Sequence, residues 1–239
     1  MNIFFVTDNK IWFDFLHEWS NESLVDTSIF CSPTGAGFFV DEIERGLIST
    51  IDLKLESIQL VEKFDMGFSC HCKQIFPKFL VEGVPCFNFH PGFNPENRGW
   101  FPQVFSIING KPVGATLHKM DCEIDHGPII ERIRVEINNW DTSKSVYDRI
   151  LNEEFKLFEK WIDRILTGDH DETHLGLAGN YNSITDFKNI CEINLNKKVT
   201  FKEAIDYLRA MTFDGYDNAF FKTGDGQKVY VSINLRLSE

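Results

Sequence analysis

The stretch Cys86-Phe87-Asn88-Phe89-His90-Pro91-Gly92 is an alternating apolar and polar segment with an abrupt end. Successive side chains of a β-strand point to opposite faces of its sheet, so Phe87 and Phe89 share one face while Asn88 and His90 share the other. We predict that the two phenylalanines pack in the core and that Pro91-Gly92 ends the strand. Ligands of open α/β sheets bind beyond the carboxyl ends of the strands, so Asn88 and His90 are predicted to lie at the mouth of a site.

Strand-like and helix-like segments alternate on both sides of this stretch. Apolar, β-branched and aromatic runs predict further strands at residues 1–7, 27–31, 57–60, 64–70, 115–120 and 129–137. Helices are predicted at residues 12–19, 38–45, 73–82, 100–109 and 143–166, the last with an apolar period close to 3.6. This alternation predicts an α/β fold, an open Rossmann-like and mostly parallel sheet flanked by helices.

A polar, glycine-containing stretch at residues 167–180 follows the longest predicted helix. We therefore predict a catalytic domain at residues 1–166 and a small C-terminal α+β unit at residues 167–239. In the second part, Thr200 and Glu203 form a capping-box pattern at the start of a helix. Two apolar runs joined by Thr223-Gly224-Asp225-Gly226 predict a terminal β-hairpin, whose strand edge and aromatic surface we expect to mediate a homodimer.

The composition argues against several classes of protein. Hydrophobic residues make up 43% and charged residues 25%, as in ordinary globular proteins, and 23 phenylalanines predict a largely aromatic core. The net charge of −12 disfavours nucleic-acid binding, because phosphate contacts need clustered Lys and Arg. No apolar run reaches the roughly 18 residues of a membrane span. We expect a cytoplasmic protein with six reduced cysteines and no metal site, since Cys70-His71-Cys72 lacks a second cysteine pair.

A second polar segment, Asp121-Cys122-Glu123-Ile124-Asp125-His126-Gly127-Pro128, separates two predicted strands. Gly127 allows the backbone to turn sharply there. A carboxylate at Asp125 can reach His90, where it would hold one imidazole tautomer and raise the affinity of the ring for a proton. Asn88, His90 and Asp125 are therefore the predicted catalytic residues.

Three motifs taken in order resemble the 10-formyltetrahydrofolate-dependent formyltransferases. They are Asn88-Phe89-His90-Pro91, Arg98-Gly99-Trp100-Phe101-Pro102 and Asp125-His126-Gly127. Within this family, Pro91-Gly92 and the short C-terminal part look most similar to the sugar N-formyltransferases that act on dTDP-linked amino-dideoxy sugars. The resemblance implies formyl transfer from N10-formyltetrahydrofolate to the amino group of such a sugar, with dTDP-4-amino-4,6-dideoxyglucose favoured, for O-antigen or lipopolysaccharide synthesis.

The predicted roles agree with the chemistry of this reaction. An amine attacks only as the free base, and an imidazole, with an unperturbed pKa near ~6.5, can take its proton at neutral pH. The Asn88 amide is expected to donate a hydrogen bond to the formyl oxygen as negative charge develops there, which is worth on the order of 3 kcal/mol in acyl-transfer sites. Asp125 is expected to orient His90 and to balance its charge.

Binding residues follow less directly from the sequence. In the family the pterin is held by backbone groups beside the catalytic strand and the aspartate loop, which implies a folate site near Pro85, Asp121, Asp125 and Gly127. Candidates for the sugar nucleotide are Lys10, Lys73 and Arg98, as cations for a pyrophosphate, and Trp12 and Trp100, as stacking rings. Lys10 and Lys73 can equally be solvated surface charges. Other acceptors stay open: a 3-amino-dideoxy sugar, glycinamide ribonucleotide, aminoacyl-tRNA or water, as does a non-catalytic folate- or nucleotide-binding module.

Overall fold

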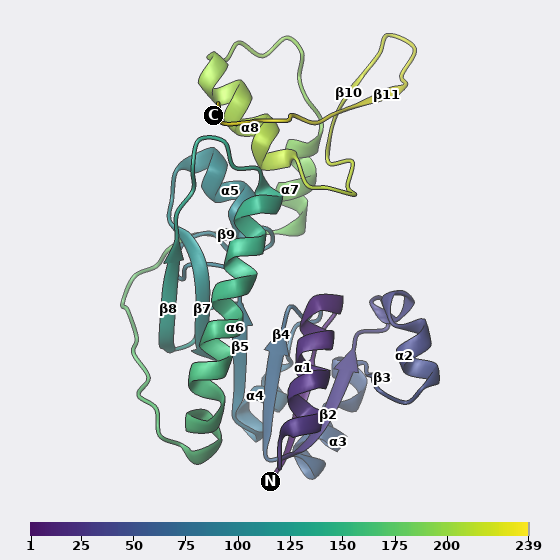
Figure 1. The fold of residues 1–239 in the computed structure, drawn as a ribbon, viewed down its shortest axis with the longest axis vertical. Helices are drawn as coiled ribbons and strands as arrows, with labels where there is room; N and C mark the ends of the chain where they lie inside the picture. Colours follow the sequence, from purple (N-terminus) through teal and green to yellow (C-terminus); the bar gives the residue numbers. More distant parts are fainter. Residues whose placement is uncertain (239) are drawn as a thin grey trace. The chain divides into compact units, whose positions relative to one another are not determined.

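The computed structural model describes residues 1–238, and its central element is a seven-stranded sheet with the strand order β3-β2-β1-β4-β5-β7-β8 (Figure 1). The strands are Asn2–Val6 (β1), Asp26–Cys31 (β2), Ser49–Thr50 (β3), Met66–Cys70 (β4), Cys86–His90 (β5), Val113–Lys119 (β7) and Ile129–Val135 (β8). The pairs β1–β2, β2–β3, β1–β4 and β4–β5 are parallel. Met120 N donates to Cys86 O, so the end of β7 lies beside the start of β5 and these two strands run antiparallel. The predicted open, mostly parallel α/β sheet is confirmed.

Most of the helices alternate with these strands, and the last two follow the last strand of the sheet. The helices are Lys10–Glu22 (α1), Val40–Glu44 (α2), Leu53–Lys63 (α3), Lys78–Gly83 (α4), Pro102–Asn109 (α5), Ser143–Thr167 (α6), Ile184–Cys191 (α7) and Phe201–Met211 (α8), with a 3-10 turn at Ala36–Phe38 (η1). Two small sheets pair Arg98–Gly99 (β6) with Tyr181–Asn182 (β9), and Ala219–Lys222 (β10) with Lys228–Val231 (β11). The capping box of Thr200 and Glu203 and the antiparallel terminal hairpin are both present as predicted, whereas α7 was not predicted.

Two predicted elements are wrong. Residues 57–60 lie inside α3 rather than in a strand, because Leu53, Ser57 and Leu60 are buried at helical spacing behind the N-cap residue Asp52. The helix predicted at residues 73–82 begins only at Lys78. The backbone N–H of Lys73 instead donates a hydrogen bond to the side chain of Asp8, after the end of β1. This contact keeps the segment from forming a helix.

Both faces of the sheet carry aromatic side chains, as the phenylalanine content predicts. On one face Phe5, Phe68 and Phe87 stand side by side in register, with ring centroids 4.9 Å and 5.7 Å apart. On the other face Phe4 lies over Gly67, whose position has no room for a Cβ atom. Phe4 also belongs to a buried cluster with residues of α3 and α4, including Leu60 and Leu80. The alternation in β5 therefore places Phe87 in the core and Asn88 on the opposite face.

The chain forms two compact units, each assembled from segments distant in sequence. The first unit contains Met1–His90, Leu117–Glu131 and Arg164–Leu175, and the second contains Pro91–Thr116, Arg132–Asp163 and Gly176–Glu239. The division of function at residue 166 stays a prediction. Within residues 1–238, no helix combines the length and the apolar character needed to cross a membrane.

Candidate active site

Strand β5 carries Asn88 and His90 on one face of the sheet. The two side chains belong to the first unit, and the residues are buried, at 8% and 5% exposure. Between them Phe89 points to the other face and is completely buried, stacked against Phe68. The core therefore anchors the strand through its phenylalanines, and this fixes the direction in which the polar residues point.

Asp125 reaches these two residues from the loop between β7 and β8. One of its carboxylate oxygens, Oδ1, lies 2.9 Å from Asn88 Nδ2 and 3.5 Å from His90 Nδ1. The backbone of Asp125 has a φ of 49°, in the left-handed region that few non-glycine residues occupy. The three residues predicted from the sequence thus come together around one oxygen atom, although they are separated by up to 37 positions.

A fourth polar residue, His118, lies in the same cluster and was not predicted. It is 1% exposed, and its Nδ1 lies 2.9 Å from Lys119 O. Because a carbonyl oxygen only accepts hydrogen bonds, Nδ1 carries the proton, and Nε2 then accepts from Asn88 Nδ2 at 3.3 Å. The signal in the sequence was a lone histidine in an apolar strand directly before the aspartate loop.

The two N–H groups of the Asn88 amide therefore face Asp125 and His118. Reversing the amide would place its oxygen against a carboxylate oxygen, and two acceptors in contact repel each other, so the chemistry determines this orientation. The Asp125 contact, at 2.9 Å, is the shorter and charge-assisted one, and the His118 contact, at 3.3 Å, is the weaker. The hydrogen bond to His118 is consequently the one that another acceptor replaces more easily.

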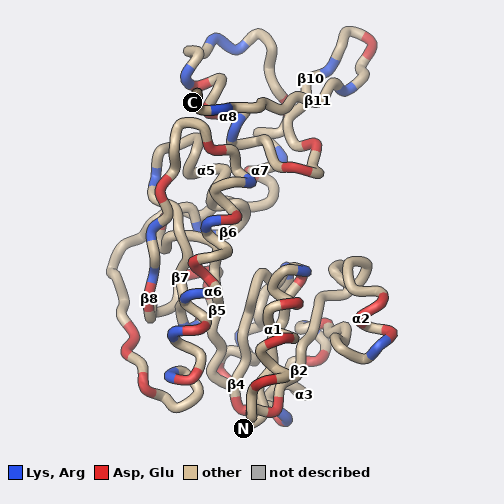
Figure 2. The backbone as a smooth tube through the Cα atoms, viewed as in Figure 1, with Lys and Arg blue, Asp and Glu red and all other residues tan. Residues whose placement is uncertain are grey.

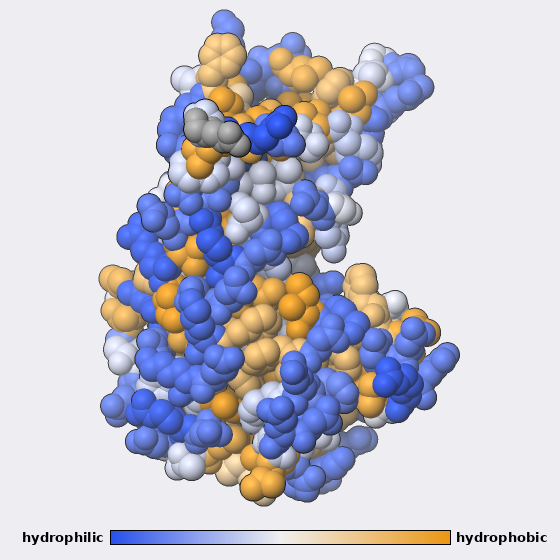
Figure 3. Space-filling view, in the orientation of Figure 1, coloured by the Kyte–Doolittle hydropathy of each residue, from blue (hydrophilic) through white to orange (hydrophobic). Residues whose placement is uncertain are grey.

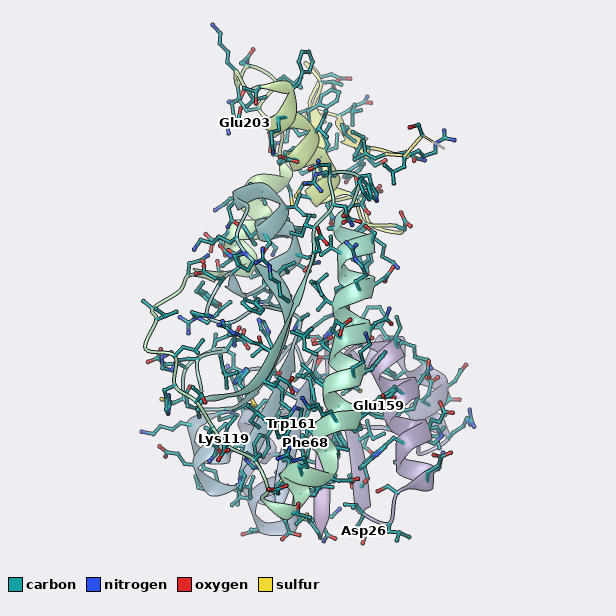
Figure 4. The ribbon with its side chains drawn as sticks, turned by 60° about the vertical axis from the view of Figure 1, so that its left-hand side comes forward. Asp26, Phe68, Lys119, Glu159, Trp161 and Glu203 are labelled. Atoms are coloured by element: carbon teal, nitrogen blue, oxygen red, sulfur yellow. The ribbon has the colours of Figure 1, made fainter. Side chains whose placement is uncertain are left out.

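The aspartate loop is organised by Asp121, which was predicted to lie beside the folate. Asp121 Oδ1 accepts a hydrogen bond from Glu123 N at 2.8 Å, and Oδ2 lies 2.8 Å from His126 Nδ1. Gly127 packs on the end of β7, where an added Cβ atom would lie 1.9 Å from the carbonyl oxygen of Lys119, a residue labelled in Figure 4. The carbonyl oxygen of Pro85, directly before β5, accepts a hydrogen bond from Gly67 N at 3.0 Å.

Substituting Gly127 with alanine is expected to displace the loop that carries Asp125. The neighbouring atom is backbone, which moves only with β7, so overpacking should cost about 1–3 kcal/mol of stability. A misplacement of Asp125 by about 1 Å should lower turnover on the order of 100-fold. Thermal unfolding and steady-state kinetics measure both effects, and Gly224→Ala, at a position with open space, serves as the control. Unchanged turnover in Gly127→Ala would show that this packing does not position Asp125.

A second polar group, centred on Asp8, ties the ends of three neighbouring strands together. Asp8 is 7% exposed and follows β1. Its Oδ1 accepts from Ser32 N at 2.8 Å and from Ser32 Oγ at 2.7 Å after β2, and its Oδ2 accepts from Lys73 N at 2.7 Å after β4. Asp8 was not among the predicted site residues, although an aspartate directly after a buried strand was the available signal.

The candidate substrate residues of the first unit differ in what they offer to a ligand. Lys10 pairs with Asp14 and, at 3.2 Å, with Glu42, among the acidic residues that Figure 2 shows along α1 and α2. Burial alone would lower the pKa of Lys10, but the hydrogen bonds and charges of these two carboxylates raise it. Lys73 instead places Nζ 5.0 Å from the centre of the Phe38 ring. Trp12 is completely buried against Phe89, so its ring supports β5 from the core and offers no exposed face to a ligand.

Arg98 and Trp100 belong to the second unit. The backbone N–H groups of both residues donate to the segment around β9, Arg98 to Asn180 O and Trp100 to Asn182 O, each at 2.9 Å. Phe101 follows with a φ of 50° and packs its ring on Phe187 of α7, with the centroids 4.3 Å apart. This segment is thus fixed by contacts within the second unit.

A histidine, an asparagine and an aspartate are gathered on one face of an open α/β sheet, a set of side chains suited to proton transfer and to hydrogen bonding of a developing oxyanion. Comparison with known proteins identifies the family. Residues 55–162 match the Formyl transferase family, and residues 186–237 match the family described as the N-formyltransferase dimerization C-terminal domain. The chain belongs to the formyltransferase family, whose members transfer formyl groups.

Three relatives illustrate this membership. The dTDP-4-amino-4,6-dideoxyglucose formyltransferase of Mycobacterium tuberculosis is 45% identical over 177 residues, which are 74% of this chain and 76% of that protein. The crystal structure of a 4-N formyltransferase from Francisella tularensis is 48% identical, with a TM-score of 0.96 over 99% of this chain and 98% of that one. An N-formyltransferase from Helicobacter canadensis, solved with folinic acid and dTDP-3-aminofucose, shares the fold at 23% identity, with a TM-score of 0.73 over 94% of this chain and 85% of that one.

Proposed function

We propose that this enzyme transfers the formyl group of N10-formyltetrahydrofolate to the amino group of a dTDP-linked amino-dideoxy sugar, with dTDP-4-amino-4,6-dideoxyglucose as its preferred acceptor. The supporting observation is the gathering of Asn88 and His90 around one oxygen of Asp125. A base and a hydrogen-bond donor held side by side are what formyl transfer to an amine requires. The activities of the mycobacterial and Francisella relatives support the choice of the sugar and of its 4-amino group.

His90 acts as the general base. Its Nδ1 faces Asp125 Oδ1 at 3.5 Å, so in the neutral ring Nδ1 carries the proton and Nε2 has the lone pair. Nε2 takes the proton that the acceptor amine loses as its nitrogen bonds to the formyl carbon. The carboxylate of Asp125 stabilises the imidazolium that forms. The two side chains are only 6% and 11% exposed, which strengthens this interaction because the local dielectric constant is lower than that of water. The imidazolium then returns the same proton to N10 of the folate as the bond between the formyl carbon and N10 breaks, so that the formamide and tetrahydrofolate are released.

Asn88 acts on the formyl oxygen. Negative charge develops there as the amine attacks. The amide N–H that points at His118 Nε2 in the resting site then donates to the formyl oxygen instead. The other N–H stays on Asp125 and keeps the amide in place. His118 therefore receives the weaker bond of the resting site and releases it during the reaction.

The residues present suit a formyl-carrying folate. His90, a buried base, and Asn88, a buried N–H donor, lie next to each other beside the aspartate loop. When bound, the folate supplies an activated formyl group. We propose that Pro85, Asp121, Asp125 and Gly127 surround its pterin, mainly through their backbone groups. On the acceptor side, Lys73 is the proposed cation for the pyrophosphate. Lys10 contributes only if the pyrophosphate replaces one of its carboxylate partners. Arg98 and Trp100 are the other two proposed substrate-binding residues.

A direct assay tests the proposal. The enzyme is incubated with N10-formyltetrahydrofolate and a panel of dTDP-amino sugars that differ in the position and configuration of the amine, and the products are weighed by mass spectrometry. We expect a gain of one formyl group on the 4-amino-4,6-dideoxyglucose derivative, and none with His90→Asn. Consumption of folate without a formylated sugar would reject the acceptor, and no reaction of either compound would reject the activity.

We further propose that the C-terminal part, residues 167–239, holds two copies of the chain together. The family matched by residues 186–237 is described by dimerization. Large apolar side chains are exposed on this part (Figure 3), including Phe201 at 90%, Leu195 and Tyr216 at 64% each, and Tyr230 at 48%. Exposure of several such groups is typical of a surface that a partner covers.

Sedimentation equilibrium at micromolar concentration is expected to give the mass of a dimer. The substitution Phe201→Glu places a charge among these apolar side chains and should shift the dimer towards monomer, because an unpaired charge is costly to bury. Asn196→Glu, at an exposed polar position of the same part, introduces the same change in charge and serves as the control. A monomeric wild-type chain would contradict the proposal.

The formylated sugar nucleotide is the proposed donor for O-antigen or lipopolysaccharide synthesis, carried out in the cytoplasm. All six cysteines are free thiols, which is usual for a reducing compartment. Loss of the enzyme should remove the N-formyl group from the surface polysaccharide, which mass spectrometry of the isolated glycan would detect. An unchanged N-formyl content would contradict this role.

A further inference from the structure

The loop that follows β2 is fixed at its base by the group around Asp8. Ser32 Oγ donates to Asp8 Oδ1 at 2.7 Å and accepts from Gly35 N at 2.9 Å. Gly35 is packed so closely that an added Cβ atom would lie 2.0 Å from Asp8 Oδ1. The turn η1 begins directly afterwards at Ala36, and Phe38 is its last residue. A buried carboxylate therefore determines where the short turn presents Phe38.

Phe38 presents an aromatic ring that the core does not use. The residue is 58% exposed, in contrast to its neighbour Phe39, which is completely buried. Lys73 Nζ lies 5.0 Å from the centre of the ring, the geometry of a cation–π contact. Lys73 pairs with no carboxylate anywhere in residues 1–238, whereas Lys10 has two such partners. An exposed ring and an ammonium group with no acidic partner thus lie side by side on a fixed loop.

The position of this pair in the sheet is that of a nucleotide site. Strand β1 lies between β2 and β4, where the strand order reverses, and ligands of doubly wound sheets bind outside the carboxyl ends of the strands at this point. Phe38 follows β2 and Lys73 follows β4, while His90 ends β5. Neighbouring strands are about 4.8 Å apart, so the end of β2 and the end of β5 are separated by roughly 14 Å. That span suits a sugar, a diphosphate and a deoxyribose laid end to end with the amine at His90.

We propose that the ring of Phe38 is the platform on which the nucleobase of the sugar nucleotide stacks, next to the diphosphate held by Lys73. The inference rests on the proposed function, since it assigns the base subsite of the same substrate. An aromatic ring supplies a flat apolar face at a low cost in conformational freedom, and stacking of a base on such a ring is sequence-tolerant. Phe38 is in this scheme a binding residue with no part in the chemistry at His90.

Binding of dTDP and of inorganic pyrophosphate, measured by isothermal titration calorimetry, tests the inference. Phe38→Leu keeps the apolar bulk and removes the aromatic face, so its Kd for dTDP should rise at least about tenfold. Phe38→Tyr keeps the face and should bind dTDP within about twofold of the wild type. Phe79→Leu, at an exposed ring of similar exposure on α4, is the matched control and should leave the affinity unchanged. The affinity for pyrophosphate should be the same in all four proteins.

The outcomes separate this inference from the proposed function. If the wild type binds dTDP and Phe38→Leu binds it equally well, the base does not stack on Phe38. If Phe38→Leu weakens dTDP and pyrophosphate alike, the side chain acts on the loop or on Lys73 and the stacking role is refuted. A wild type that binds no dTDP refutes the proposed substrate class and this subsite with it. Under turnover conditions, Phe38→Leu is expected to raise KM for the sugar nucleotide and to leave kcat unchanged.

Discussion

Replacing His90 with asparagine is expected to lower kcat by about 100- to 10,000-fold, the usual contribution of a general base. The amide can occupy the position of Nδ1 and face Asp125, but it has no basic lone pair with which to take a proton from the amine. Dissociation constants for the folate and the sugar nucleotide should change little, because the phenylalanines on the other face of β5 continue to hold the strand. Single-turnover kinetics and calorimetry measure the two effects separately.

A matched histidine outside the site controls for this change. His174 is exposed, and His174→Asn should retain wild-type turnover. Turnover of His90→Asn within tenfold of the wild type would mean that another group accepts the proton. Because His118 Nε2 is the nearest other imidazole nitrogen to Asp125 Oδ1, at 3.8 Å, the double variant His90→Asn with His118→Asn would then identify it.

Replacing Asp125 with asparagine is expected to lower kcat by about 100-fold or more, although the two side chains have nearly the same shape. The oxygen that accepts from Asn88 can be kept, but the charge that stabilises protonated His90 is lost. A carboxylate raises the affinity of a neighbouring imidazole for a proton, and a base must be unprotonated to act. Its removal should therefore move the acid limb of the kcat/KM profile to lower pH while the plateau falls.

The loop offers a control with the same change of charge. Glu123 is exposed in the same loop, and Glu123→Gln should leave both the plateau and the acid limb unchanged. A normal plateau in Asp125→Asn would show that the carboxylate is dispensable. A lowered plateau with an unmoved acid limb would show that Asp125 acts without influencing the protonation of His90.

Local sequence patterns were sufficient to predict those elements whose structure depends on residues close together in the sequence. The alternation of polar and aromatic residues in β5 predicted which side chains face the core, and the burial of Phe87 and Phe89 confirms it. The capping box of α8 and the terminal hairpin depend on residues a few positions apart, and both are present. The gathering of Asn88, His90 and Asp125 was predicted from the alternation in β5 and from the order of three motifs that resemble those of the formyltransferases.

Contacts between distant segments decided the remainder. Residues 57–60 have an apolar pattern that suits a short strand, yet the packing of Leu53 and Leu60 on the sheet makes them helical. Only the antiparallel placement of β7 beside β5 brings His118 to Asn88. Likewise, Asp8 binds both Ser32 and Lys73 only because β2, β1 and β4 end at the same edge of the sheet. Periodicity shows which side of an element is apolar, but which buried polar group meets which partner depends on the register of strands far apart in the chain.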